Sequence, residues 1–298
     1  MFKLVIFISG IVGGIFLETI NPSLYLSAKD LLKRTNYEIS IKLHGYDKCY
    51  LDEISFEDMS QEDKNLLIIG HAYSLMKKDR FLRDSKLFIF IEKNKILIDK
   101  IFFTGDVYKN PSKSKWVELK MLLNKMEIEF EIAPGNHDVG FGNNTKRDIF
   151  TDVFPYQYPV YYKSFAGLTS IVLDSTKDPW VINKDRISPI LESNKNKNEN
   201  LYLFSHHLLH EISSKISNSL EGFPENLSKN KNHEILKELR ESFKSVTSIS
   251  GDIGAFNYQP SIECLKKDEV MYVGSGLGEK KDNELIGLIN NKLYKTRI

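Results

Sequence analysis

Short apolar runs recur through the middle of the chain, and each ends at a glycine or proline followed by polar residues. Three of these runs, at residues 66–69, 100–104 and 129–133, are typical of strands buried in a parallel sheet. Between them, residues 85–97 are apolar enough to form a helix, and residues 114–126 carry apolar side chains at helical spacing. This order predicts right-handed crossovers and a parallel sheet.

The second half of the chain also alternates between apolar runs and polar segments. Residues 161–165 and 168–173 predict a strand pair. Further strands are predicted at 201–204, 246–250 and 270–273, and a surface helix at 231–244. The polar stretch 193–200 predicts a solvated loop without function. Two sheets with flanking helices fit this order better than one doubly wound sheet.

The amino terminus carries an apolar run from Leu4 to Leu17. The run is shorter than the ~20 residues that cross a bilayer squarely, so a short or tilted span through residues 4–20 is one interpretation. A cleaved secretory signal, which would release the protein outside the cell or into the periplasm, is the other. We expect residues 1–27 to be a single-pass membrane anchor or a signal, with the anchor favoured and the side of the membrane open.

The remaining chain divides into two parts. Residues 28–64 predict a mixed, polar linker or helical lead-in, because Asp30, Lys33 and Arg34 indicate a helix after the apolar segment. Residues 65–298 predict one large α/β domain, and a content of 41% hydrophobic residues permits a sizeable core.

Charge and cysteine content narrow the functional classes. The 41 Lys and Arg residues nearly balance 40 Asp and Glu residues, so we expect no nucleic-acid partner. Cys49 and Cys264 are far apart, which predicts two buried thiols and neither a disulfide framework nor a cysteine metal site. Cysteine content therefore does not indicate whether the protein resides in an oxidising or a reducing compartment.

Polar residues with ligand chemistry gather at the predicted strand ends. They are His71, Asp106, Asn136, His137, His206 and Asp252. Imidazole, carboxylate and amide oxygen are ligands that a divalent transition metal accepts. Each also has a simpler interpretation: Asp106 as a helix N-cap, and His71 or Asp252 as turn residues.

Three of these segments resemble successive motifs of the calcineurin-like metallophosphoesterases. They are Gly105-Asp106, Gly135-Asn136-His137-Asp138 and Ser205-His206-His207, and the resemblance extends over about residues 65–290. It implies a four-layer α/β/β/α sandwich. It also implies hydrolysis of a phosphomonoester or phosphodiester by attack of metal-bound hydroxide on phosphorus.

The resemblance assigns a role to each residue. Asp106 would bridge two metals, and Asn136 and His206 would bind the second. His137 would not be a ligand but would donate a proton to the leaving oxygen or stabilise the phosphoryl oxygens, with Asp138 holding its imidazole. His207 and His210 are expected to lie outside the ligand set, and Tyr73 would either bind a phosphate oxygen or pack as an aromatic residue.

Two motifs depart from the family pattern. Where the family has Asp-x-His, this chain has Ile69-Gly70-His71, and where it has Gly-His-x-His, the chain has Gly251-Asp252-Ile253-Gly254. The first metal keeps only His71 and Asp106. The second keeps a plausible set of four ligands: Asp106, Asn136, His206 and Asp252. We therefore predict one firmly bound Mn, Fe or Zn ion and a second that is weak or absent.

The departures leave an alternative open, namely a catalytically impaired member of this fold that acts as a binding or scaffold module at a membrane. Retention of Asn136 and His137 favours the enzyme, because a binding module has no need of a proton donor. A nuclease of this fold is disfavoured by the neutral charge. The substrate and the oligomeric state stay open.

Overall fold

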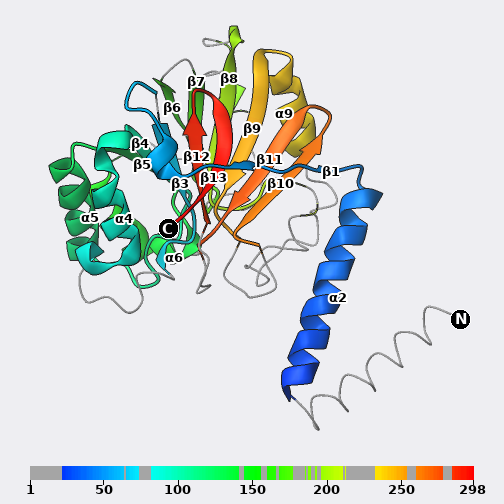
Figure 1. Cartoon of the computed structure of the whole chain (residues 1–298), viewed down its shortest axis with the longest axis horizontal. Coiled ribbons are helices and arrows are strands. Elements are labelled where there is room, and N and C mark those ends of the chain that lie inside the picture. Colours follow the sequence, from blue (N-terminus) through cyan, green and yellow to red (C-terminus); the bar gives the residue numbers. More distant parts are fainter. Residues whose placement is uncertain are drawn as a thin grey trace, which may run out of the picture.

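Two β-sheets form the centre of the molecule, and helices lie on their outer sides (Figure 1). The computed structural model describes residues 22–63, 65–73, 82–140, 144–155, 160–165, 168–176, 196–210, 232–253, 260–277 and 284–298, with Asp185, Ile187, Ser188, Glu192 and Ile212. The mixed α/β class predicted from the sequence is confirmed.

The first sheet has six strands in the order β2-β13-β12-β3-β4-β5. They are β2 (Asp52–Glu53), β3 (Asn65–Ile69), β4 (Lys100–Phe103), β5 (Glu129–Ile132), β12 (Glu284–Ile289) and β13 (Lys292–Arg297). Strands β3, β4 and β5 are parallel, with Leu67 opposite Ile101 and Ile101 opposite Phe130. This confirms the three strands and the parallel pairing that the apolar runs predict.

Helices α4 (Lys86–Lys93) and α5 (Lys113–Lys125) make the crossovers. Ser85 and Ser112 begin them, because their side chains accept the backbone N–H groups of residues three positions later. Trp116, Leu119 and Leu123 form the fully buried side of α5, as their spacing predicts.

The second sheet has seven strands in the order β1-β10-β11-β9-β8-β7-β6. They are β1 (Asp47–Lys48), β6 (Val160–Phe165), β7 (Leu168–Leu173), β8 (Asn196–Ser205), β9 (Phe243–Ser250), β10 (Ile262–Lys267) and β11 (Val270–Ser275). The predicted loop at 193–200 is wrong from Asn196 onward. There, Asn200 pairs with both Leu168 and Ser245, because backbone pairing between two neighbours needs no apolar side chain.

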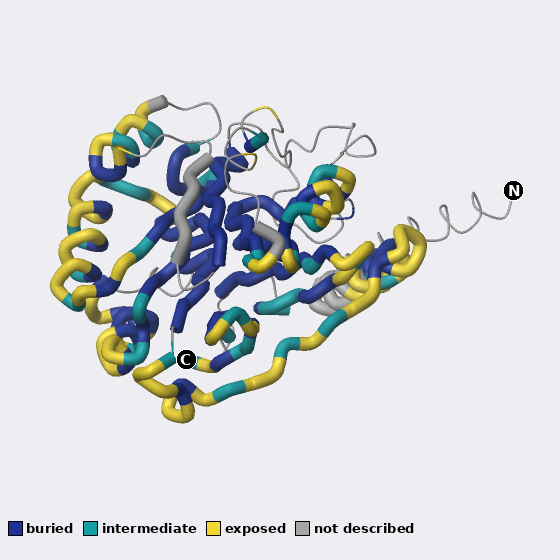
Figure 2. Tube along the Cα trace, turned by 90° about the horizontal axis from the view of Figure 1, so that it is seen from above, coloured by how far each residue is buried: buried dark blue, intermediate teal, exposed yellow. Residues whose placement is uncertain are grey.

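The two sheets pack face to face around a shared core. Phe102 of β4 stacks on Phe204 of β8 with ring centroids 3.9 Å apart. On the outer side of the first sheet, α4, α5 and α7 (Asn144–Val153) close a second core. On the outer side of the second sheet, α9 (Asn232–Arg240) and the end of α2 close a third. Buried chain concentrates at the centre in Figure 2.

Strands β6 and β7 form the antiparallel pair that the sequence predicts. Two further antiparallel hairpins, β10–β11 and β12–β13, are not predicted as hairpins. Strands β10 and β11 join at Asp268 and Glu269, whose φ angles are 48° and 64°. Strands β12 and β13 join at Asn290 and Asn291, with φ angles of 47° and 65°. Two positive φ angles are the signature of a tight hairpin turn, which usually contains glycine; its absence here hides both turns from the sequence pattern.

The lead-in belongs to the folded body. Helix α2 (Pro22–Leu43) confirms the predicted helix, but the following residues are not a linker. Strand β1 pairs with β10 and strand β2 pairs with β13, so the segment 47–53 joins the edges of both sheets. The folded unit therefore begins well before residue 65.

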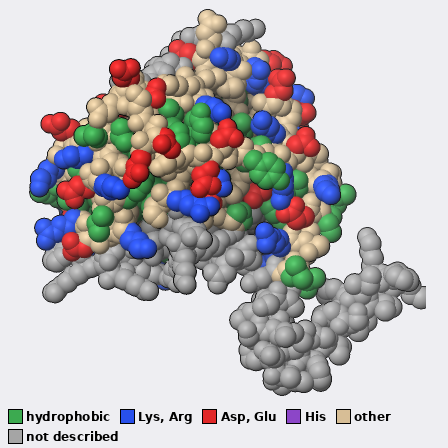
Figure 3. Space-filling model, in the orientation of Figure 1, with side chains coloured by type: hydrophobic (Ala, Val, Ile, Leu, Met, Phe, Trp, Pro, Cys, Tyr) green, Lys and Arg blue, Asp and Glu red, His purple; other side chains and the backbone are tan. Residues whose placement is uncertain are grey.

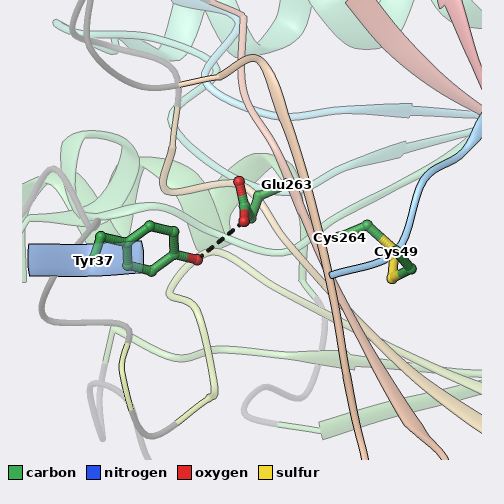
Figure 4. Close-up of a disulfide and its surroundings, with 4 residues drawn as sticks. All are labelled: Tyr37, Cys49, Glu263 and Cys264. Atoms are coloured by element: carbon green, nitrogen blue, oxygen red, sulfur yellow. Dashed lines mark hydrogen bonds between the residues drawn. A yellow bond between two sulfur atoms is a disulfide. The ribbon is translucent and has the colours of Figure 1, made fainter. Parts of the chain in front are cut away.

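A disulfide joins Cys49 to Cys264, so the prediction of two separate thiols is wrong (Figure 4). The backbone N–H of Cys49 donates to the carbonyl of Cys264 over 3.0 Å, as the pairing of β1 with β10 requires. One residue along β10, Glu263 accepts a 3.3 Å hydrogen bond from the Tyr37 hydroxyl of α2. Because 215 residues separate the cysteines, sequence spacing did not indicate their contact.

The predicted anchor at residues 4–20 lies outside the described residues. Among the helices that are described, none combines the length and the apolar character needed to cross a membrane. Basic and acidic side chains are interspersed over the face seen in Figure 3.

Candidate metal centre

The ends of five strands converge on one buried cluster. His71 follows β3, Asp106 follows β4 and Asn136 follows β5 in the first sheet, whereas His206 follows β8 and Asp252 follows β9 in the second. The carboxyl ends of parallel strands are where open α/β sheets place their sites. Both sheets therefore contribute to the cluster, and the sequence-predicted residues lie together.

The backbone at the first two strand ends is unusual. His71 has a φ of 52° and Asp106 a φ of 56°, a left-handed conformation that non-glycine residues rarely adopt. The two loops support each other, because the N–H of His71 donates to Gly105 and the N–H of Tyr73 donates to Asp106. Such strained positions persist only where the surroundings fix them, and they concentrate at functional sites.

Gly105 allows the Asp106 loop to lie directly against His206. Its φ is 87°, and a Cβ atom at this position would lie 2.5 Å from Nδ1 of the His206 imidazole. A larger residue would push the imidazole away from the cluster. The glycine of the Gly-Asp motif is therefore explained by packing.

His206 is the centre of the cluster. Its Nδ1 lies 3.1 Å from the carbonyl oxygen of Thr104, and since a carbonyl only accepts, Nδ1 carries the proton. The fully buried Nε2 then faces three oxygens. They are Oδ1 of Asn136 at 3.0 Å, Oδ1 of Asp106 at 3.5 Å and Oδ1 of Asp252 at 3.8 Å.

This arrangement fits a divalent metal. With Nδ1 carrying the proton, the lone pair of Nε2 faces several oxygens, and a cation bound between them would relieve their mutual repulsion. Metal–ligand distances of ~2.0–2.2 Å separate neighbouring ligand atoms by about 3 Å or more, in line with the separations around Nε2. The four residues predicted for the second metal thus have both the chemistry and the spacing to hold one ion.

His71 is tied to Asp106 on the other side of the cluster. Its Nε2 lies 3.0 Å from Oδ2 of Asp106, and its Nδ1 lies 3.3 Å from the Ile253 carbonyl. Burial lowers the pKa of His71, but the bond to Asp106 more than offsets this and the net pKa is raised. Burial raises the pKa of Asp106, but His206 and His71 outweigh burial and hold it below its usual range.

The loop after β5 forms the short helix α6 (Asn136–Val139). The backbone N–H of His137 donates to Oδ1 of Asp106 over 3.0 Å. Asp138 differs from the expectation that it would hold the His137 imidazole, because its two oxygens accept the N–H groups of Tyr108 and Gly135, each over 3.0 Å. Burial, helped by the charge of Asp106, raises the pKa of Asp138 to about 7.

An aromatic ring flanks the His137 imidazole instead. The Tyr73 ring lies edge-on to His137 at 5.2 Å and to His71 at 4.7 Å between ring centroids. Burial lowers the pKa of the half-buried His137, although Asp106 opposes the shift. Tyr73 therefore packs between the two imidazoles, which is one of the two roles expected for it.

His207 lies directly beside the cluster. Ligand atoms of His206, His207 and Asp252 all lie within 4.8 Å of one another. Nδ1 of His207 is 3.0 Å from the Ser175 hydroxyl, and burial keeps its pKa well below the usual value. His210 is also buried, but it lies between the rings of Tyr46 and Tyr272, away from the ligands.

Sequence reasoning also missed two cations on α7. The Lys146 ammonium donates to the His137 carbonyl over 3.1 Å. Arg147 binds Asp174 and the Thr176 hydroxyl at the end of β7. No motif indicates either residue, because they lie on the helix α7, beyond the loop after β5.

The position of the missing first carboxylate is apolar. Ile69 is fully buried in the core between the first sheet and its helices, and it offers no ligand atom to the cluster. Gly254, where the second missing ligand would stand, lies outside the described residues.

Comparison with known proteins agrees with the motifs. Residues 69–243 match the family model described as calcineurin-like phosphoesterase. No curated protein matches the chain. Among solved structures, the chain is similar to a conserved uncharacterized protein and predicted phosphoesterase from Streptococcus pneumoniae TIGR4, with 6% identity and a TM-score of 0.30, over 79% of this chain and 98% of that one.

Proposed function

The chain belongs to the calcineurin-like phosphoesterases, and from that premise we propose that it is a metal-dependent hydrolase of phosphate esters. The observation that carries the proposal is the geometry of His206. Its Nε2 faces Asn136, Asp106 and Asp252 within 3.8 Å while its Nδ1 is committed to a backbone carbonyl.

We propose that these four residues hold one ion of Mn, Fe or Zn. The buried Ile69 stands where the family places a carboxylate for the other ion. Nε2 of His71 lies 3.0 Å from Oδ2 of Asp106, and in this proposal His71 orients that carboxylate. The site is therefore mononuclear in this proposal, with a second ion weakly held or absent.

When bound, the ion would supply Lewis acidity to a phosphoryl oxygen and a lowered pKa to a water nucleophile. Residues of the chain supply the proton donor and hold the loop in place. His137 lies beside Asp106, and its half-buried imidazole is the group available to donate a proton to the leaving oxygen. Asp138 fixes the loop that carries Asn136 and His137 by accepting two backbone N–H groups.

Turnover by the full-length, metal-loaded chain tests this function. The substrates are p-nitrophenyl phosphate, a monoester, and bis-p-nitrophenyl phosphate, a diester. We expect His137→Ala to lower turnover by ~10²–10⁴-fold, the usual contribution of a general acid. Activity that survives Asn136→Ala or His137→Ala unchanged would remove the assignment.

Ile69 also supports a second candidate, a catalytically impaired binding module. Such a protein would bind metal and inorganic phosphate but turn over neither ester. Calorimetric binding of phosphate to the metal-loaded chain, measured beside turnover, separates the two functions.

We further propose that the domain lies on the oxidising side of a membrane, anchored by residues 4–20. The Cys49–Cys264 disulfide supports this, because disulfides persist mainly in oxidising compartments. Protease added to intact cells should then digest the domain. Protection of the domain, with both cysteines reactive toward a thiol reagent, would contradict the proposal.

A further inference from the structure

The Lys146 ammonium contacts His137, the residue that follows the proposed metal ligand Asn136. The ammonium donates to the carbonyl of His137 over 3.1 Å, and the N–H of the same His137 donates to Asp106. A single residue thus connects the lysine to the cluster. The bond also holds the ammonium beside the residue proposed as proton donor.

The base of α7 fixes this lysine in place. The neighbouring Arg147 is bonded to Asp174, whose side chain is fully buried, and to Thr176. These bonds tie the first turn of α7 to the end of β7, while Lys146 ties the same turn to the loop after β5. The position of the ammonium is therefore set by two strand ends.

The two cations differ in the charge and the N–H donors that their protein partners leave for a ligand. Arg147 is neutralised by the carboxylate of Asp174. In the part of the chain that the structure describes, Lys146 has only the His137 carbonyl as a partner, and an ammonium has three N–H donors. Two of its donors and its full charge remain for a ligand.

We propose that Lys146 is a specificity-determining residue that recognises the dianionic phosphoryl group of a phosphomonoester. The inference rests on the proposed function and adds a substrate class to it. A monoester presents three non-ester oxygens and up to two negative charges, whereas a diester presents two such oxygens and one charge. A fixed cation beside a one-metal site therefore favours the monoester.

Lys146→Gln tests the role of the charge, because the amide can still donate to the His137 carbonyl. Lys120→Gln is the matched control: Lys120 also donates to a backbone carbonyl, that of Val153 at the other end of α7, over 3.2 Å. Both variants are made in the full-length, metal-loaded chain. Lys146→Arg, which keeps the charge, serves as the conservative rescue.

For Lys146→Gln we expect kcat/KM to fall about 10–100-fold on p-nitrophenyl phosphate, the loss of one charge-assisted hydrogen bond. On bis-p-nitrophenyl phosphate we expect less than about a threefold change by the same argument. Lys120→Gln should change neither value, and Lys146→Arg should recover most of the monoester activity. An equal fall on both esters would overturn the proposal, since it would mean that Lys146 only supports the loop.

Calorimetric titration with inorganic phosphate separates this proposal from the proposed function. If the wild-type chain hydrolyses neither ester but binds phosphate, and Lys146→Gln weakens that binding about tenfold or more, the hydrolase assignment fails and the role of Lys146 stands. Phosphate binding that is absent, or equal in both proteins, would overturn the role of Lys146.

Discussion

Nε2 of His206 lies 3.0 Å from Oδ1 of Asn136, although the two residues are 70 positions apart and follow strands of different sheets. The packing of the sheets brings them together, so site and core depend on each other.

Gly105→Ala should damage both stability and metal binding. The added Cβ would lie 2.5 Å from the His206 ring at a φ of 87°, so strain and steric conflict act together. We expect a loss of about 3 kcal/mol or more in the free energy of unfolding and a metal affinity lowered at least about tenfold. Denaturant unfolding and metal titration measure the two effects.

Gly45→Ala is the control for that variant. Gly45 also has a positive φ, 71°, but a Cβ there meets nothing within 4 Å. Gly45→Ala should lower the free energy of unfolding by only about 1–2 kcal/mol and leave the metal affinity unchanged. Matching effects from the two substitutions would show that Gly105 does not position His206.

Lys100→Met should strongly destabilise the first sheet. Lys100 is fully buried and lies 3.0 Å from Glu131, whose side chain is 5% exposed. Removing the lysine takes the Lys100 ammonium away from a buried carboxylate, and breaking a buried ion pair in this way costs about 3–5 kcal/mol. The double variant Lys100→Met/Glu131→Leu should recover most of the loss, and urea denaturation measures both. If the double variant is no more stable than the single one, the pair is not the cause.

Reduction of the disulfide should lower the melting temperature. The bond closes a loop of 215 residues, so the chain-entropy model gives up to about 5 kcal/mol of stabilisation. Thermal unfolding with and without dithiothreitol measures the change. Cys49→Ser/Cys264→Ser should melt at the lower temperature in both conditions. A wild-type melting temperature that does not respond to full reduction would argue against the bond.

Acid should unfold the protein partly through His210. Burial lowers the pKa of His210 to about 3, against about 6.5 in the unfolded chain. Between these values the unfolded state binds one more proton, so stability is full above pH ~6.5 and falls as pH decreases, by up to about 1.4 kcal/mol per unit. His210→Gln should show a shallower fall than wild type in denaturant unfolding between pH 6.5 and 4. Identical slopes would contradict the assignment.

The sequence predicts β3, β4, β5 and their helices well, because each strand is a continuous apolar run that ends at a polar motif. The proximity of His71, Asp106 and Asn136 follows from the same rule, since residues at the ends of neighbouring parallel strands must meet. Their proximity to His206 and Asp252 depends on the packing of the two sheets. The local sequence pattern was sufficient to predict those elements whose structure depends mainly on contacts between residues close in sequence.

Contacts between distant segments are what the sequence did not reveal. The disulfide needs β1 to pair with β10, and the partners of Asp138 depend on how the loop after β4 meets the loop after β5. The hairpin of β12 and β13 turns through two asparagines with positive φ, which resemble any polar pair in the sequence. Lys146 reaches the His137 carbonyl through packing that no motif indicates.

Metal content of the full-length chain after equilibrium dialysis against Mn²⁺ or Zn²⁺ tests the central claim most directly. We predict about one tightly bound ion per chain in the wild type and in His44→Ala, a control at an exposed histidine. The ion should be lost in His206→Ala. Metal retained by His206→Ala, or two tightly bound ions in the wild type, would contradict the account.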